Sequence, residues 1–393
     1  MADPLSVLHE EDVAKLTGEL IRIPSENPPG EEEAVADFVA EYLRELGLSV
    51  EYYECLPKRP NVIGRLKGST GGPKLMFNGH LDVVPVADPT RWSFKPFSGA
   101  VKDGRILGRG ATDMKGGLAA MLSATRVLVE QNVPLQGELL ITGVMDEESY
   151  GLGATSLVDA GTRADMAVIG EPTDLAIMIA QKGILWLEIT TRGVSGHASQ
   201  MGSSGGPVNA IYKMGRVLSA LEEHLDALKQ RKDELLGSAS VSVGTISGGV
   251  KINVVPDACT VEVDRRIIPG EEAEKAKTEI DDLLRSLAAS DPDLRAETKV
   301  LFHREPAHIP ESAGIVGICQ RAVKAVTGAE GRVGGFTAST DMNILMNRGG
   351  IPTVILGPGR LQQAHGTDEF VESSQVLAAA KIYTKIALDA LTG

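Results

Sequence analysis

Apolar residues along the chain follow two patterns, and the change from one to the other falls near residues 182 and 306. Before residue 182, short apolar runs at 74–77, 137–144 and 166–170 alternate with helical stretches, and such runs are typical of strands buried on both faces. After residue 306 the same style returns. Its predicted elements are a helix over 312–327, a strand over 353–356 and a helix over 374–391.

The middle of the chain instead alternates apolar and polar residues, which predicts half-buried antiparallel strands. The predicted order is β-α-β-β-α-β, a small α+β arrangement with both helices on one face of the sheet. The strands are expected at 184–191, 240–246, 259–267 and 297–302, and the amphipathic helices at 207–228 and 271–287.

These patterns predict an α/β protein whose first domain has a mainly parallel, mixed sheet flanked by helices. This domain is discontinuous and comprises residues 1–181 and 306–393. A smaller α+β domain of the ferredoxin-like type, residues 182–305, interrupts it.

Composition and charge narrow the possible functions. The chain has 393 residues, 42% of them hydrophobic and 23% charged, as in globular proteins. Its net charge of −14 and the lack of a basic stripe argue against a nucleic-acid partner. It has neither an apolar run of membrane-spanning length nor a signal-peptide pattern, so we expect no membrane partner and a cytoplasmic protein.

Candidate chemistry begins where the apolar run 74–77 ends. Gly79 is followed by His80 and Asp82, whose side chains point the same way in an extended segment. The carboxylate of Asp82 is therefore placed to accept the second N–H of a metal-bound imidazole. An isolated His-x-Asp is more often a core histidine beside a solvated aspartate, so this pair alone does not define a site.

Further acids and one histidine follow other predicted strands or turns. Asp113 stands in Gly108–Asp113, where the last glycine of a dinucleotide-binding fingerprint would be, and a carboxylate there would repel a pyrophosphate. Each residue alone has a structural explanation, such as a helix cap or an acidic loop. Together they supply the oxygen and nitrogen ligands that two cations need if one carboxylate bridges them. The other candidate ligands are His80, Glu148, Glu171 and His365, and Glu147 stands beside Glu148 as an acid that holds no ion.

With these motifs the chain resembles, over nearly its whole length, the metallopeptidase family that contains acetylornithine deacetylase, succinyl-diaminopimelate desuccinylase, aminoacylase-1 and carboxypeptidase G. The resemblance rests on the segments Gly79–Pro85, Gly108–Gly117, Asp146–Glu148, Gly170–Pro172, Gly357–Gly359 and Ala364–His365.

The resemblance implies a role for each residue of the set. Asp113 would bridge two metal ions, with Asp82 orienting His80 and with Glu147 as general base. One ion would be completed by His80 and Glu171, and the other by Glu148 and His365. Zinc is the first expectation for the two divalent ions, with cobalt or manganese as alternatives.

The resemblance also implies substrate contacts and a partner. His197, in the inserted domain, would stabilise the oxyanion and reach into the site of a second subunit, so that the protein would be a homodimer through residues 182–305. Asn253 and Arg266 look like the family residues that hold a substrate carboxylate, although Arg266 also fits a domain-closing ion pair. Ser339 and Thr340 resemble another segment on the substrate side.

We therefore predict a metal-dependent amidohydrolase that cleaves the N-acyl amide of an amino acid, of the acetylornithine deacetylase or desuccinylase type. Its substrate would be an N-acyl amino acid or a short peptide. A carboxypeptidase or dipeptidase on the same scaffold is the alternative within the class, because substrate preference depends on the shape of the pocket. An alternative from another class is a binding protein without catalysis.

Overall fold

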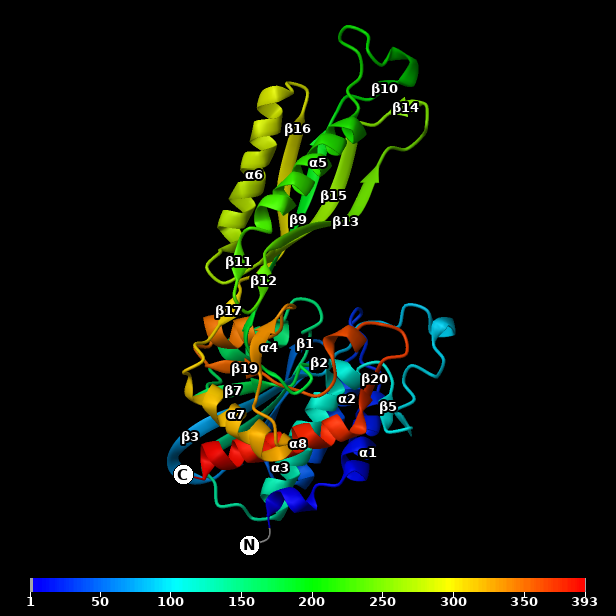
Figure 1. Cartoon of the computed structure of the whole chain (residues 1–393). Helices are drawn as coiled ribbons and strands as arrows, with labels where there is room; N and C mark the ends of the chain where they lie inside the picture. Colours follow the sequence, from blue (N-terminus) through cyan, green and yellow to red (C-terminus); the bar gives the residue numbers. More distant parts are fainter. Residues whose placement is uncertain (1–2, 393) are drawn as a thin grey trace. The chain divides into compact units, whose positions relative to one another are not determined.

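The computed structural model of the chain describes residues 3–392, apart from the side chain of Thr70. The chain forms two compact units, shown in Figure 1. The catalytic unit, as we name the first, holds the chain up to Ile179, Ile309–Phe336, and the chain from Thr340 onward. The inserted unit holds Ala180–His308 together with Thr337–Ser339.

The main sheet has nine strands in the order β1-β2-β6-β3-β7-β19-β8-β17, and β18 also pairs with β8. Strand β3 lies between β6 and β7 and is parallel to both, and β7 is parallel to β19. The strands outside this parallel centre, β1, β2 and β8, join it in antiparallel pairs. The strands span Ser49–Leu56 (β1), Arg59–Lys67 (β2), Ser69–His80 (β3), Gln136–Val144 (β6), Met166–Ile169 (β7), Ile177–Gln181 (β8), Ala307–His308 (β17), Val333–Phe336 (β18) and Thr353–Ile355 (β19).

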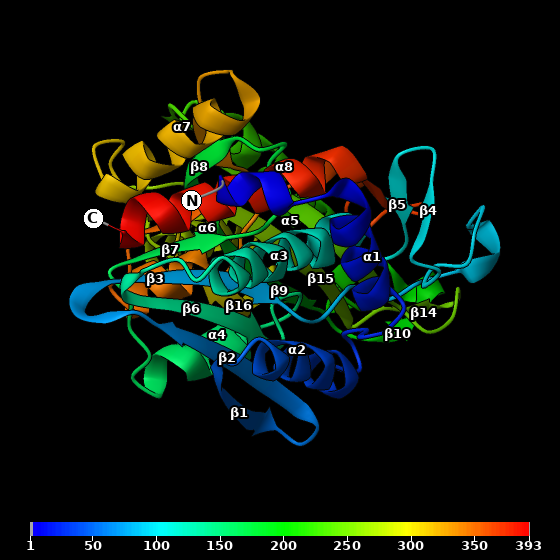
Figure 2. The same ribbon diagram turned by 90° about the horizontal axis from the view of Figure 1, so that it is seen from below.

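Helices cover both faces of this sheet, as Figure 2 shows. Helices α1, α3 and α8 lie on one face, with α7 packed against α8, and α2 and α4 lie on the other. The bounds are Glu10–Ile21 (α1), Glu33–Glu45 (α2), Gly116–Glu130 (α3), Leu152–Asp159 (α4), Gly314–Thr327 (α7) and Ser373–Leu391 (α8). The predicted α/β class with a mainly parallel, mixed sheet between helices is confirmed.

Small residues explain how closely helix α3 approaches the parallel strands. A side-chain carbon added to Gly117 would stand 2.0 Å from the carbonyl oxygen of Gly170, directly after β7. The start of α3 therefore packs backbone against backbone at the strand end. Helix α3 carries buried alanines, leucines and valines on several sides, as expected for a helix enclosed between a sheet and α8.

A small three-stranded sheet in the catalytic unit was not predicted. Its strands are Ala100–Lys102 (β4), Arg105–Leu107 (β5) and Phe370–Glu372 (β20), in the order β20-β5-β4. With three residues each, they are too short to give a readable alternation. The pairing of β5 with β20 brings the segment before Asp113 next to the segment after His365.

The inserted unit contains an antiparallel sheet in the order β13-β15-β9-β16. Alternate residues such as Leu185, Leu187 and Ile189 of β9 form a core with apolar residues of α5 and α6, so both helices cover one face. The bounds are Gly183–Arg192 (β9), Ala210–Leu228 (α5), Ser240–Gly248 (β13), Ala258–Ile267 (β15), Ala273–Ser290 (α6) and Arg295–Arg304 (β16). Two short ribbons accompany them: Gly196–His197 (β10) with Val254–Val255 (β14), and Lys232–Asp233 (β11) with Gly237–Ser238 (β12).

None of the helices within residues 3–392 has both the length and the apolar character that crossing a bilayer requires.

Candidate metal centre

The register of three parallel strands brings the candidate residues to one edge of the sheet. His80 at the end of β3 pairs with Val144 at the end of β6, and Asn78 pairs with Ile169 at the end of β7. The residues that follow each strand therefore emerge together at the carboxyl edge, where open α/β sheets bind ligands. Those residues are Asp146–Glu148 after β6 and Glu171 after β7.

Asp113 reaches this edge from the π-helical turn η3 (Ala111–Lys115), where its own backbone is extended. The carboxylate of Glu369 holds this turn in place. It accepts the backbone N–H groups of Gly110, Thr112 and Asp113 at 2.9–3.1 Å. Arg109 donates to the same carboxylate at 2.6 Å, so a buried ion pair fixes the segment that carries Asp113.

The two carboxylate oxygens of Asp113 face two different imidazoles. Its Oδ1 lies 3.0 Å from Nε2 of His80, and its Oδ2 lies 3.3 Å from Nε2 of His365. Glu171 stands on the His80 side, 3.5 Å from Nε2, and Glu148 stands on the His365 side, 3.1 Å from Nε2. The arrangement consists of two sets of possible metal ligands that share the carboxylate of Asp113.

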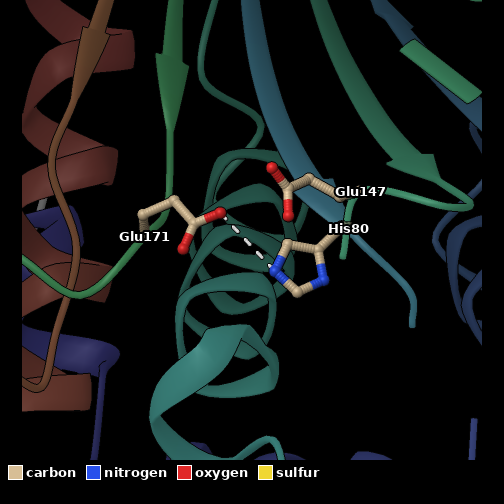
Figure 3. Close-up of side chains that lie close together, drawn as sticks. All are labelled: His80, Glu147 and Glu171. Carbon is tan, nitrogen blue, oxygen red and sulfur yellow. Dashed lines mark ion pairs between the residues drawn. The ribbon is translucent and has the colours of Figure 1, made fainter. Parts of the chain in front are cut away.

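Glu147 lies on the His80 side of this arrangement. Figure 3 shows the carboxylates of Glu147 and Glu171 turned toward the His80 ring. Ligand atoms of these three residues all lie within 4.8 Å of one another, and the same holds for His80, Asp113 and Glu148. Glu147 is nearly buried, with an exposed fraction of 8%.

Burial and mutual charge shift the titration of this cluster. Burial raises the pKa of Glu171, and the charge of Asp113 raises it further. Hydrogen bonds to Asp113 and Glu148 raise the pKa of His365 to about 10. Burial by itself lowers the pKa of His80, but Asp113 and Glu171 outweigh it and hold that pKa well above its usual value. The shifts of the two imidazoles favour their positively charged form beside the carboxylates.

Asp82 lies beside His80, but its carboxylate does not make the predicted contact. Nδ1 of His80 is 2.9 Å from the backbone carbonyl of Asp82 and 3.7 Å from the carboxylate. The carboxylate instead accepts the backbone N–H groups of Glu147 and Glu148, at 3.2 and 3.1 Å, and the side-chain amide of Asn27 at 2.8 Å. Alternation along a strand predicts to which face of the sheet a side chain points. It does not predict whether the carbonyl or the carboxylate oxygen of Asp82 faces the His80 ring.

The predicted substrate residues mostly lie in the inserted unit. His197 is exposed, with Nδ1 2.7 Å from Oγ of Ser199, and Asn253 lies on the adjoining loop, where its carbonyl accepts the N–H of Ala198. Arg266 is half-buried and forms an ion pair with Asp264, two residues earlier on β15, at 2.9 Å. Two more lie on the segment before η5 (Ile344–Arg348): Ser339 accepts from Gln181 at 3.4 Å, and Thr340 is buried in the catalytic unit.

The donor set of the catalytic unit fits divalent ions. Oε1 of Glu148 is buried and lacks a hydrogen-bond partner among the described residues, which is costly for a carboxylate unless a cation stands beside it. Two imidazoles and several carboxylates are the ligands that zinc, cobalt and manganese accept. Two ions that share a carboxylate would match the arrangement around Asp113.

Sequence reasoning missed the residues that hold these donors. Glu369 and Arg109 fix the Asp113 turn, and Arg109 also donates to the carbonyl of His365 at 3.4 Å while its guanidinium lies over the ring of Trp92. The one available signal was that Glu369 follows His365 by four residues and is flanked by the acid Asp368.

Carboxylates gather here around the buried imidazole of His80 and the more exposed one of His365 at one edge of a mixed α/β sheet, an arrangement that metal-dependent hydrolases use. A comparison with models of known protein families identifies one family. The model "Peptidase family M20/M25/M40" matches residues 76–389, and the chain belongs to this family. It is therefore a hydrolase of amide or peptide bonds.

Three curated relatives match this chain over most of their own length. An N-formyl-4-amino-5-aminomethyl-2-methylpyrimidine deformylase of Bacillus subtilis is 30% identical over 97% of this chain and 94% of its own. A succinyl-diaminopimelate desuccinylase of Paracoccus denitrificans is 30% identical over 95% and 97%. An acetylornithine deacetylase of Vibrio campbellii is 31% identical over 86% of each chain.

A solved structure shares the fold. It is the YXEP protein of Bacillus subtilis, described as a dinuclear metal binding peptidase from the M20 family, with 17% identity and a TM-score of 0.73. The match covers 98% of each chain.

Proposed function

We propose that this protein is a two-metal amidohydrolase that removes the acyl group from an N-acylated amino acid, of the acetylornithine deacetylase or succinyl-diaminopimelate desuccinylase type. The observation that carries the proposal is the position of Asp113 between His80 and His365, each with a second carboxylate. Relatives named for removing formyl, acetyl and succinyl groups support the substrate class.

In this proposal one ion is held by His80, Asp113 and Glu171, and the other by Asp113, Glu148 and His365. Bound ions would lower the pKa of a water molecule and polarise the carbonyl of the scissile amide. Zinc is the first candidate, with cobalt and manganese as alternatives. The solved family member described as dinuclear supports the count of two.

Glu147 is the general base in this scheme. Its carboxylate takes a proton from the attacking water and gives it to the leaving nitrogen, and the second proton of the water passes from the new carboxyl group to the amine, so that water and amide become a carboxylate and an ammonium group. Its place beside His80 and Glu171 also fits a third metal ligand. The two roles differ in what substitution does to the metal content.

The test compares Glu147→Gln with its neighbour Glu148→Gln. Glu147→Gln is expected to lower kcat at least about 100-fold while both ions stay bound, because general acid–base catalysis contributes about 10²–10⁴-fold. Glu148→Gln is expected to lose metal as well as activity. Turnover of the metal-loaded Glu147→Gln protein within about tenfold of wild type would remove Glu147 from the mechanism.

The substrate is tested with a panel of N-acetyl, N-succinyl and N-formyl amines together with dipeptides, each with zinc, cobalt or manganese added. A dipeptidase or carboxypeptidase is the second candidate, supported by the peptidase description of the solved family member. We expect the N-acyl amino acids to be cleaved with the highest kcat/KM. Dipeptides cleaved faster than every N-acyl amino acid would favour the peptidase, and bound metal with no turnover on any substrate would favour a binding protein.

The proposal includes a homodimer formed through the inserted domain, with His197 completing the site of the second subunit and with Asn253, Arg266, Ser339 and Thr340 on the substrate side. Exposure of His197 is compatible with this role. Light scattering of the full chain measures the mass in solution, and a monomer that turns over at the wild-type rate would contradict the role of His197.

A further inference from the structure

A row of buried polar side chains connects the start of β2 to the loop after β6. Arg59, the first residue of β2, donates to both carboxylate oxygens of Glu32, at 2.5 and 2.8 Å. Its Nη2 also donates to Oδ1 of Asp146 at 3.0 Å. The side chains of Glu32 and Asp146 are 0% and 2% exposed and that of Arg59 is 13% exposed, so this ion-pair network is largely shielded from solvent.

Asn27 extends the row to the metal centre. Its side-chain amide donates to Oδ1 of Asp146 at 3.1 Å and to Oδ2 of Asp82 at 2.8 Å. Asp82 in turn accepts the backbone N–H groups of Glu147 and Glu148. A continuous set of hydrogen bonds therefore runs from Arg59 to the backbone that carries the proposed base and one proposed ligand.

Asp146 also shapes the loop directly. Its φ of 67° is left-handed, a conformation that aspartate tolerates better than most residues. Its Oδ2 accepts the N–H groups of Tyr150 and Leu152, both at 3.3 Å. The carboxylate thus closes the loop on one side and receives Arg59 and Asn27 on the other, which leaves little freedom for Glu147.

We propose that Arg59 is a positioning residue for Glu147: through Asp146 and Asn27 it fixes the loop that places this carboxylate beside the metal centre. The inference rests on the proposed function of Glu147. Arg59 is also the cation in direct contact with two of the three buried carboxylates in the row. Without it, Glu32, Asp82 and Asp146 would repel one another and the loop would relax.

The experiment replaces Arg59 by methionine, which keeps much of the volume and removes the charge. The matched control is Arg65→Met on the same strand, because Arg65 pairs with the exposed Glu51 and with Glu138 and is outside the row. We expect Arg59→Met to lower kcat about 10–100-fold, since a misplacement of about 1 Å can cost about 100-fold. KM and the content of bound metal should stay close to wild type. Arg65→Met should leave kcat unchanged.

A second measurement separates positioning from general damage. In a Glu147→Gln background the placement of residue 147 no longer matters for proton transfer. Arg59→Met should therefore change the residual kcat of that variant by less than about threefold. The effects of the two substitutions would then be far from additive. An equal factor in both backgrounds would overturn the proposal. So would a folded, metal-loaded Arg59→Met enzyme with kcat within about threefold of wild type.

If Arg59→Met alone fails to fold because it leaves Glu32 buried and unpaired, the same criteria apply to Arg59→Met combined with Glu32→Gln, which removes that charge. The two hypotheses fail in different ways. A fully active Glu147→Gln enzyme contradicts the proposed base, whereas a fully active Arg59 variant beside an inactive Glu147→Gln contradicts only the positioning role.

Discussion

The buried charged side chains of the two units differ in the kind of ion-pair partner that they have. In the inserted unit, charges are matched by permanent partners: Arg265, whose side chain is fully buried, pairs with Glu271 at 2.7 Å, and Lys213 pairs with Asp291 at 2.8 Å. At the edge of the main sheet, the ion-pair partners of Asp113 and Glu171 are imidazoles, which are charged only when protonated.

This difference shows which unit is built for an external cation. A buried carboxylate that is matched by a fixed cation needs no further charge, whereas a cluster with more buried carboxylates than fixed cations is costly until positive charge arrives. The catalytic unit confines these carboxylates to a few strand-end residues. The acids that support them, Glu369 and Asp82, accept hydrogen bonds from Arg109, Asn27 and the backbone. The predictions below test whether the contrast is functional.

The largest effect is expected for Asp113→Asn, which keeps the shape of the bridging side chain and removes its charge. Both proposed ions lose a shared ligand, so hydrolysis should fall to the background of the assay and bound metal to less than one ion per chain. Metal analysis and steady-state kinetics of the same preparation measure this. Asp264→Asn in the inserted unit is the control, because it breaks a half-exposed ion pair and should retain metal.

Removal of metal by a chelator should abolish hydrolysis reversibly and destabilise the catalytic unit. Ions at 100 times their dissociation constant contribute about 2.7 kcal/mol through linkage, and their loss returns carboxylate repulsion to the strand ends. Hydrogen exchange should therefore increase after β3, β6 and β7, with little change in β9 and β15. Equal changes in both units would show that the metal does not act on the cluster alone.

An intermediate effect is expected for Glu369→Gln. The carboxylate of Glu369 accepts hydrogen bonds from the backbone N–H groups of Gly110, Thr112 and Asp113. The amide of glutamine has only one accepting oxygen, and its NH₂ would face one or more of these N–H groups, donor against donor. Loss of a residue that supports a metal ligand typically costs about 10–100-fold in affinity or activity. Titration of the metal-free protein with zinc measures the loss of affinity. Glu372→Gln, which pairs with Arg105 at the surface, should bind zinc normally.

The sequence was sufficient for the main elements and for the members of the cluster, because both depend on local pattern. The helix predicted over 374–391 is α8, which spans Ser373–Leu391. His80, Asp113, Glu148, Glu171 and His365 could be found as polar residues that end apolar runs or turns, and the structure brings them together.

The supporting contacts could not be predicted, because they join residues far apart in sequence through side-chain geometry. Glu369 receives hydrogen bonds from a segment 259 residues earlier, and its place four residues after His365 does not reveal that partner. The carbonyl of Asp82, rather than its carboxylate, faces His80, because the carboxylate accepts hydrogen bonds from Asn27 and from the backbone of Glu147 and Glu148. Side-chain direction follows from strand period, but the choice between two oxygens depends on the groups that surround them.

The smallest effect is expected for Arg192→Met, which removes an ion pair between Arg192 and Glu297 across β9 and β16 in the inserted unit. Both side chains are more than half exposed, at 57% and 62%, so water screens the interaction, and such pairs contribute about 0–1 kcal/mol. Denaturant unfolding should shift by no more than that, with kcat and bound metal unchanged. A large loss of hydrolysis would mean that charges of the inserted sheet take part in catalysis, and the division of roles between the two units would then be wrong.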